Sequence, residues 1–404
     1  MSSAIEQALS IGDLRRLARR RLPRILFELI ESGVEDEYGL VRNEAAFRQF
    51  RLLPRYLGEI EKRDQGMDLM GRHYDCPFGI APTGFAAMLR RDADSMLATA
   101  ARGANIPFVI SGASAAPIQA LARCAPDHVW YHLYPAKDSA FTEDIFKRVA
   151  DAGIGTLVYT VDNPVYPKRE RDIRNGFSLP LRLRLSTMLE AATHPAWVLE
   201  YLRHGGMPVM DTWARYAGEG KSAGEIAAFF RSQSPCIKTW RDIEVWRARW
   251  PGHLVLKGIQ HPDDARRAVD SGVDGIIVSN HGGKAFDALP SPLETLPAVK
   301  AAVGLRAAVM LDSGIRRGSD MVIARCLGAD FVFVGRAALY GVVAGGRAGA
   351  ERAIEILRTE VDMSLAMIGC PRFDELGDRF LICPHFSSGG SQGVESDGSG
   401  ADRH

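Results

Sequence analysis

Eight short apolar runs recur along the chain, and each is followed by a polar or glycine-containing turn and then by a stretch with helical spacing. Continuous apolar character of this kind is typical of parallel strands that are buried on both faces. Eight such units are the number that closes a (β/α)8 barrel, so we predict the α/β class and a TIM barrel. The runs are FGIAP 78–82, PFVIS 107–111, VWYHLY 129–134, TLVYTV 156–161, LVLKG 254–258, GIIVS 275–279, AAVMLD 307–312 and DFVFV 330–334.

The segments outside these repeats complete the predicted organisation. Residues 1–50 show helical spacing and should form a helical cap, with RLPRILFELIESG 21–33 expected as one amphipathic helix that ends at Gly33. The barrel should occupy residues 51–385. Its fourth strand is followed by an insertion at 178–238, far longer than the usual two to about six residues of such a loop, and we interpret it as lid-like. The tail 386–404 is rich in Gly and Ser, and we predict that it is disordered.

Charge and cysteine content exclude several classes of protein. A net charge of +1 over 404 residues gives no electrostatic case for nucleic acid as a partner. The six cysteines form no CxxC pair and have no histidine at ligand spacing, so no metal site is predicted. We find no signal peptide or membrane-spanning run and expect a cytoplasmic protein. The insertion alternates basic and apolar residues, a pattern that would also suit peripheral contact with the inner face of a membrane.

Polar side chains follow every predicted strand at the end where TIM-barrel enzymes carry their working residues. The last two loops, DSGIRRGSD 312–320 and GRA 335–337, have the small residues and arginines of a phosphate site, with backbone N–H groups and Arg316 or Arg336 holding a dianion. The residues at the strand ends are Thr83, Ser111, His132, Tyr134, Thr160, Asp162, Lys257, Ser279, Asn280, His281, Asp312, Gly335 and Arg336.

Two of these residues carry reactive groups. Lys257 lies within an apolar strand and needs an anionic partner; it fits a Schiff-base lysine, a cation that faces a reduced flavin, or a structural salt bridge. His281 follows the sixth strand in SNHGG 279–283 and is a candidate general base, because a neutral imidazole accepts a proton well near pH 7. Asp162 could orient it and stabilise the imidazolium.

At these positions the chain resembles the FMN-dependent 2-hydroxy-acid dehydrogenases and oxidases, a family that includes glycolate oxidase, flavin-type lactate dehydrogenases and mandelate dehydrogenase. The resemblance covers roughly residues 10–380. EDEYG 35–39 and IGCP 368–371 favour the mandelate and lactate dehydrogenase branch. The matching motifs are SNHGG 279–283 with an Asp four residues later, TVDNPVYPKRERDIRN 160–175, LVLKGI 254–259, DSGIRRGSD 312–320 and VGRAALYG 334–341.

The resemblance implies bound FMN, a small-molecule substrate, and oxygen, a quinone or a cytochrome as electron acceptor. Gly84, where many oxidases carry Ala, favours a dehydrogenase, and the family commonly forms homotetramers. For the substrate it implies Tyr134, Arg169 and His281. For the flavin it implies Pro82, Thr83, Gly84, Ser111, His132, Thr160, Lys257 and Ser279, and for the ribityl chain and phosphate Asp312, Gly314, Arg316, Gly335 and Arg336.

The departures from the family pattern fall around the substrate. Lys284 stands where an arginine usually clamps the substrate carboxylate, and a lysine lacks the bidentate fork of a guanidinium. Leu29 replaces a usual tyrosine, and His132 replaces a usual glutamine on the third strand. We therefore expect weak binding of lactate or glycolate and a pocket rebuilt for a larger, less acidic substrate.

Four functions follow from these observations. The first is FMN-dependent oxidation of a 2-hydroxy acid, or a related alcohol, to the 2-keto product, with His281 as base and with Arg169 and Lys284 positioning the substrate. The alternative is a tailoring oxidase in a biosynthetic pathway, acting on an amine or a peptide-derived substrate. A Schiff-base aldolase on Lys257 and a flavin-binding protein without turnover are further possibilities.

Overall fold

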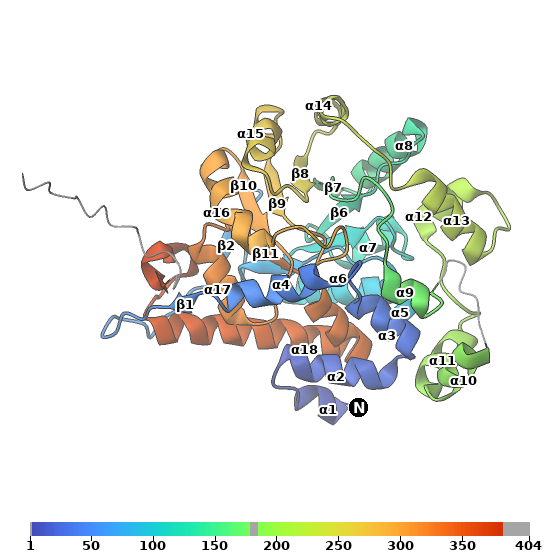
Figure 1. The fold of residues 1–404 in the computed structure, drawn as a ribbon, viewed down its shortest axis with the longest axis horizontal. Coiled ribbons are helices and arrows are strands. Elements are labelled where there is room, and N and C mark those ends of the chain that lie inside the picture. Colours follow the sequence, from blue (N-terminus) through green and yellow to red (C-terminus); the bar gives the residue numbers. More distant parts are fainter. Residues whose placement is uncertain (1, 178–184, 383–404) are drawn as a thin grey trace, which may run out of the picture.

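The computed structural model describes residues 2–177 and 185–382, and eight parallel strands form a closed barrel at its centre (Figure 1). The barrel closes in the order β10-β11-β4-β5-β6-β7-β8-β9. All eight predicted strands form, and their side chains are almost entirely buried, as expected for strands covered on both faces. They are β4 (Phe78–Ile80), β5 (Phe108–Ser111), β6 (Val129–Leu133), β7 (Thr156–Thr160), β8 (His253–Lys257), β9 (Gly275–Val278), β10 (Ala308–Leu311) and β11 (Phe331–Val334).

Helices follow each barrel strand and cover the outside of the barrel (Figure 1). The last of them, α18 (Arg336–Ile368), begins directly after β11 and is interrupted at Gly346, where φ is +62°. None of the helices in the described ranges is long and apolar enough to cross a membrane. The other helices of this layer are α5 (Ala86–Leu89), α6 (Ala93–Gly103), α7 (Ile118–Cys124), α8 (Ser139–Asp151), α15 (Pro262–Asp270), α16 (Pro292–Val303) and α17 (Gly318–Cys326).

The N-terminal cap has four helices in the described residues, and the helix predicted over 21–33 forms but is shorter, at Arg24–Glu31. The chain breaks at Pro23, which has no N–H to donate, so one helix ends at Arg21 and the next runs only to Glu31. The first two helices pack on α18, whereas the third and fourth reach the open end of the barrel. They are α1 (Ser2–Glu6), α2 (Ile11–Arg21), α3 (Arg24–Glu31) and α4 (Tyr38–Phe47).

The segment between β7 and β8 is largely helical and projects from one side of the barrel (Figure 1). Residues 178–184 of this insertion and the predicted disordered tail 386–404 lie outside the described residues. The helices of the segment are α9 (Glu170–Arg174), α10 (Leu185–Ala192), α11 (Pro195–Arg203), α12 (Asp211–Ala217), α13 (Ala223–Gln233) and α14 (Trp240–Arg249). Short pairs β1 (Arg51–Leu52) with β12 (Leu381–Ile382) and β2 (Met67–Leu69) with β3 (Arg72–Tyr74), and the turns η1 (Phe373–Glu375) and η2 (Asp378–Phe380), complete the fold.

Candidate active site

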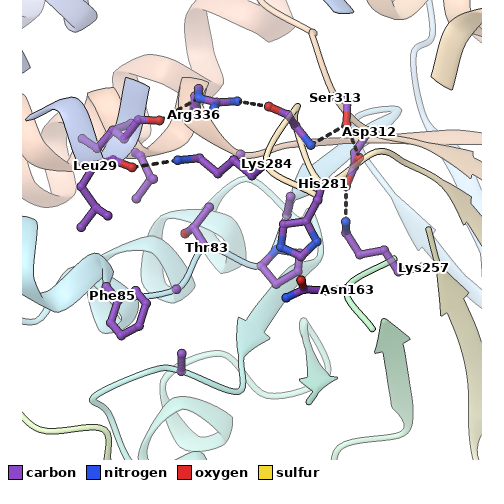
Figure 2. A pocket seen from close by; sticks show the side chains of 18 of the residues that line it. Leu29, Thr83, Phe85, Asn163, Lys257, His281, Lys284, Asp312, Ser313 and Arg336 are labelled. Carbon is purple, nitrogen blue, oxygen red and sulfur yellow. Dashed lines mark hydrogen bonds and ion pairs between the residues drawn. The ribbon is translucent and has the colours of Figure 1, made fainter. Parts of the chain in front are cut away.

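A large cavity opens at the C-terminal ends of the barrel strands, with an empty volume of about 1430 Å³ that is partly open to solvent (Figure 2). The cavity brings together residues that are far apart in the sequence, from α3 to the start of α18. The predicted site residues in its wall are Leu29, Pro82, Thr83, Gly84, Tyr134, Arg169, Lys257, His281, Lys284, Asp312, Gly314, Arg316, Gly335 and Arg336.

The remaining predicted site residues, Ser111, His132, Thr160, Asp162 and Ser279, are not part of that wall, and all five side chains are buried. His132 packs edge-on against Tyr134, with 4.6 Å between the ring centroids. Neither of its ring nitrogens has a hydrogen-bond partner among the described residues. Burial and the nearby Lys257 hold the pKa of His132 well below its usual value, so the ring is neutral.

His281, which lines the cavity, forms a hydrogen-bonded pair with the buried Asp162. Nδ1 of His281 lies 2.9 Å from Oδ1 of Asp162, and that same oxygen accepts a 2.7 Å hydrogen bond from Thr160 Oγ1. Burial raises the pKa of Asp162, but His281 and Lys257 outweigh it and hold that pKa well below its usual value. Asp162 is therefore a carboxylate beside the imidazole, and Nε2 of His281 is left as the ring nitrogen able to receive a proton.

A glycine makes this pairing possible. Gly258 follows β8 with φ of +105°, and a Cβ at this position would lie 2.4 Å from Cβ of Asp162. Any larger residue would displace the Asp162 side chain. The loop that carries His281 is also unusual, because His281 itself has φ of +59° and its N–H donates to Ser279 Oγ at 3.1 Å.

Lys257 extends from the end of β8 and is neutralised by carboxylates. Its Nζ lies 3.1 Å from Asp312 Oδ2 and 3.9 Å from Asp162 Oδ2, and it donates to Ser279 Oγ at 2.8 Å. Burial alone would lower the pKa of Lys257, but the two aspartates raise it above the usual value. A lysine held as an ammonium is a poor Schiff-base nucleophile, so the geometry disfavours the aldolase hypothesis.

The two arginines expected at a phosphate already have partners. Arg336 donates to the backbone oxygens of Ile30 at 2.8 Å, Ser32 at 3.0 Å and Gly282 at 2.8 Å. Arg316 pairs with Glu44 of α4 at 2.9 Å. The guanidinium of Arg336 thus fastens α3 to the His281 loop with three of its five N–H donors.

Lys284, predicted to position the substrate, extends towards α3 (Figure 2). Its Nζ donates to the backbone oxygen of Leu29 at 2.8 Å and lies 3.4 Å from Ser32 Oγ. The Leu29 side chain contributes to the apolar part of the wall. Arg169, which precedes α9, lines the same cavity, and its Nε has no partner among the described residues.

A family model described as FMN-dependent dehydrogenase matches residues 18–383. This chain belongs to the FMN-dependent dehydrogenase family. A protein of Mycobacterium tuberculosis provisionally named L-lactate dehydrogenase is 39% identical over 93% of the chain and 89% of its own length. The (S)-mandelate dehydrogenase of Pseudomonas putida is 37% identical over 92% of the chain and 93% of its own length. The crystal structure of a monotopic membrane protein, (S)-mandelate dehydrogenase, superposes with a TM-score of 0.90 at 36% identity, covering 93% of this chain and 100% of that one.

The cavity of this FMN-dependent dehydrogenase suits its cofactor. A phosphate is favoured at the N-terminus of α18, where Gly335 precedes the first free N–H groups. Gly314, with φ of +89°, lets the neighbouring loop pass so close to α4 that a Cβ would lie 2.2 Å from Asn43 O. Lys257 lines the same cavity as a buried ammonium, a charge that would suit a cofactor that becomes negative on reduction.

The wall also contains residues that the sequence analysis missed. Ser313 has φ of +78°. It lies within the motif 312–320, so its position beside Asp312 and Gly314 could have identified it as a site residue. Phe230, Arg231, Ser234 and Pro235 come from the insertion and gave no local signal, because only the path of the folded chain returns them to the cavity. Others are Ile30, Ala81, Phe85, Leu89, Ala113, Asn163, Tyr166, Pro167, Gly282, Ile315, Phe333, Val334 and Leu339.

Proposed function

We propose that this FMN-dependent dehydrogenase oxidises a 2-hydroxy acid to the corresponding 2-oxo acid, with His281 as the base. The observation that carries the proposal is the His281–Asp162 pair, whose histidine lines one cavity with the cation Arg169 and the phenol of Tyr134. The names of the relatives, lactate and mandelate dehydrogenase, point to the same substrate class.

Different residues of the site have different roles in this proposed reaction. Arg169 binds the substrate carboxylate, and Tyr134 provides a hydroxyl at the same wall. Nε2 of His281 takes one proton from the substrate as the C–OH becomes C=O, and the Asp162 carboxylate stabilises the imidazolium that results. FMN, when bound, would supply the acceptor for the electron pair and the second hydrogen that the substrate loses. The ammonium of Lys257 would offset the negative charge that the cofactor gains.

The apolar part of the wall supports a substrate with a larger side chain than that of lactate. Leu29, Phe85, Leu89 and Phe230 all contribute to it. An aromatic or branched group could displace water there and gain about 25 cal/mol per Å² of apolar surface buried. We therefore expect mandelate-like acids to reduce the flavin faster than lactate or glycolate.

Anaerobic mixing of the FMN-loaded enzyme with a panel of hydroxy acids, amino acids and amines tests the proposal. Bleaching of the flavin by hydroxy acids alone is the expected result, and bleaching by amines alone would revive the tailoring oxidase, which the names of the relatives do not favour. His281→Asn should retain FMN and lose about 10²–10⁴-fold in the rate of flavin reduction. Near-normal reduction in that variant would contradict the assignment of the base.

We also propose peripheral contact with the inner face of a membrane through the insertion, with a membrane quinone as electron acceptor. Helices α10 and α11 expose Met188, Leu189, Leu199 and Leu202. Such a group of apolar side chains on short helices suits an interfacial anchor.

We also propose a cytoplasmic location and a homotetramer. The mass of the purified protein in solution tests the oligomeric state.

A further inference from the structure

The loop that carries His281 has an unusual backbone. Three residues in a row, His281, Gly282 and Gly283, have φ of +59°, +67° and +75°. Glycine adopts this left-handed region readily, but histidine does so at a cost in free energy, and such a residue persists only where its surroundings fix it. The backbone of His281 is therefore a position that other parts of the molecule must determine.

The side chain of Asn280 bridges this left-handed turn. Its Oδ1 accepts from the N–H of Gly283 at 3.1 Å, and its Nδ2 donates to the carbonyl of Pro290 at 3.2 Å. These two bonds fix which end of the amide is oxygen and which is nitrogen. Because both bonds connect residues on either side of His281, the Asn280 amide restrains the segment from which the imidazole extends.

The remaining hydrogen-bonding positions of this amide are taken by Asn43 of α4, in the N-terminal cap. Asn43 Nδ2 donates to Asn280 Oδ1 at 2.8 Å, and Asn43 Oδ1 accepts from Asn280 Nδ2 at 2.7 Å. The opposite orientation of the Asn43 amide would bring nitrogen to nitrogen at 2.7 Å and oxygen to oxygen at 2.8 Å. Both residues are only 1% exposed, so an amide group left unpaired here would be costly.

A separate contact holds α4 against the same loop. The carboxylate of Asp287 accepts from the N–H of Tyr38 at 3.1 Å and from that of Gly39 at 2.7 Å, at the start of the helix. The helix and the loop are so close that a Cβ on Gly283 would lie 2.9 Å from the backbone of Leu40. We therefore expect α4 to stay docked when the Asn43 side chain is changed.

We propose that Asn43 is a positioning residue for the base: it holds the Asn280 amide and, through it, the left-handed backbone that directs the His281 imidazole to Asp162. The inference rests on the proposed function, because that function makes His281 the base. Asn43 does not line the cavity, so its effect reaches the substrate only through His281. The cap helix α4 then determines the geometry of the base in addition to covering the barrel.

The first test separates chemistry from binding. Asn43→Leu has a similar volume and removes both bonds to Asn280. In the FMN-loaded enzyme, the limiting rate of flavin reduction by mandelate should fall about 10–10²-fold, since displacement of a reacting group by about 1 Å can cost about 10²-fold. The dissociation constant of phenylglyoxylate, the 2-oxo product, should change less than about threefold, because the groups that bind the acid are unaltered. Anaerobic stopped-flow absorbance and a binding titration measure the two quantities.

Two further variants distinguish positioning from general damage to the fold. Asn43→Leu in a His281→Asn background should cause no further loss of rate, because a residue that acts only through His281 has nothing left to position. Leu14→Ala is the control for stability, since Leu14 is fully buried on α2, which packs on α18. This control should lower the free energy of unfolding at least as much as Asn43→Leu does and leave the rate unchanged.

The proton on Nδ1 of His281 gives a readout that does not depend on turnover. The Asp162 carboxylate accepts this proton at an N···O distance of 2.9 Å. In the oxidised, substrate-free enzyme, proton NMR should show it as a low-field signal that exchanges slowly with water and is absent from His281→Asn. The signal should exchange faster in Asn43→Leu and keep its wild-type rate in Leu14→Ala.

Three results would overturn the inference: an unchanged reduction rate in Asn43→Leu, the same fold loss in the His281→Asn background, or an equal loss in Leu14→Ala. Where Asn43→Leu does not fold, Asn43→Ser, which leaves room for a water, is judged by the same criteria. Failure of the proposed function would appear differently, as wild-type flavin that hydroxy acids do not bleach, and the NMR comparison of His281 would still test its position.

Discussion

Among single residues of the site, Asp162 has contacts with several reactive groups at once. It pairs with His281 at 2.9 Å, accepts from Thr160 at 2.7 Å and lies 3.9 Å from Lys257. These partners hold the pKa of Asp162 below its usual value, although the side chain is only 3% exposed. The carboxylate is therefore placed to stabilise an imidazolium. A neutral residue of the same shape would lack the charge to do so.

Asp162→Asn should keep FMN bound but slow substrate-driven flavin reduction by about 10²-fold or more, because an amide cannot offset the charge that His281 gains. Stopped-flow absorbance under anaerobic conditions measures the rate. Thr160→Val is the matched control, since it removes a hydrogen bond to the same oxygen and leaves the charge in place. A rate for Asp162→Asn equal to that of Thr160→Val would assign Asp162 a purely structural role.

Residue identity was predictable where a strand end determined the position. Asp162, Lys257 and His281 each follow or end a barrel strand, and closure of the barrel brings such ends together whatever the loops do. The partner of Lys284 was not predictable, because it is a backbone oxygen on α3, more than two hundred residues earlier in the chain. The sequence showed that the clamping arginine was replaced, but not that the lysine would bond to the C-terminal end of α3.

At the level of elements, α3 is fastened to the barrel mouth by side chains that bind its C-terminal carbonyls. The last four carbonyls of a helix lack intrahelical partners, and cations are favoured beside them. Lys284 takes the oxygen of Leu29, and Arg336 takes those of Ile30 and Ser32. The two residues thereby connect the cap to the loops that follow β9 and β11.

Arg336→Met should lower the free energy of unfolding by about 3 kcal/mol, since it removes three hydrogen bonds from a charged donor and leaves carbonyls unpaired. Chemical denaturation measures the loss, and hydrogen exchange should rise first in α3. Arg347→Ala, on the same helix, removes an exposed pair with Glu351 and should change stability by less than about 0.5 kcal/mol. Equal losses in the two variants would show that Arg336 does not fasten the cap.

The positions of the barrel strands could be predicted from the sequence more closely than those of the helices. The eight barrel strands form where expected, because burial on both faces leaves an unbroken apolar run in the sequence. The helix expected over 21–33 begins only after Pro23, because the helical spacing of the apolar residues does not show where the chain changes direction at the proline. The helices of the insertion were not resolved from the sequence, since their packing depends on neighbours far away in the chain.

At the scale of the whole molecule, the exposed apolar side chains of α10 and α11 indicate where we expect contact with a membrane. On α11 the apolar residues divide between two faces: Trp197 and Tyr201 are buried and donate hydrogen bonds to the backbone oxygens of Met88 and Ala87. Leu199 and Leu202 lie on the exposed side, at 46% and 70% exposure. The packing face thus holds the helix in place and leaves the other face available to a lipid surface.

The membrane proposal predicts that the FMN-loaded protein sediments with vesicles of phosphatidylcholine and phosphatidylglycerol, more strongly as the anionic lipid increases and less strongly at high salt. Leu199→Glu/Leu202→Glu should reduce binding by at least about tenfold, which corresponds to about 1.4 kcal/mol. Full burial of one leucine contributes about 1.5–3 kcal/mol, so even partial burial of the two would account for this loss, and the carboxylates are repelled by the anionic surface. The same variant should bleach normally with hydroxy acids, because neither leucine lines the cavity. Leu305→Glu is the matched control: Leu305 is 97% exposed and follows α16, outside the α10 and α11 patch. Equal sedimentation of the double variant and this control would place the membrane contact elsewhere on the molecule, and wild-type protein that stays in the supernatant at low salt would refute the contact altogether.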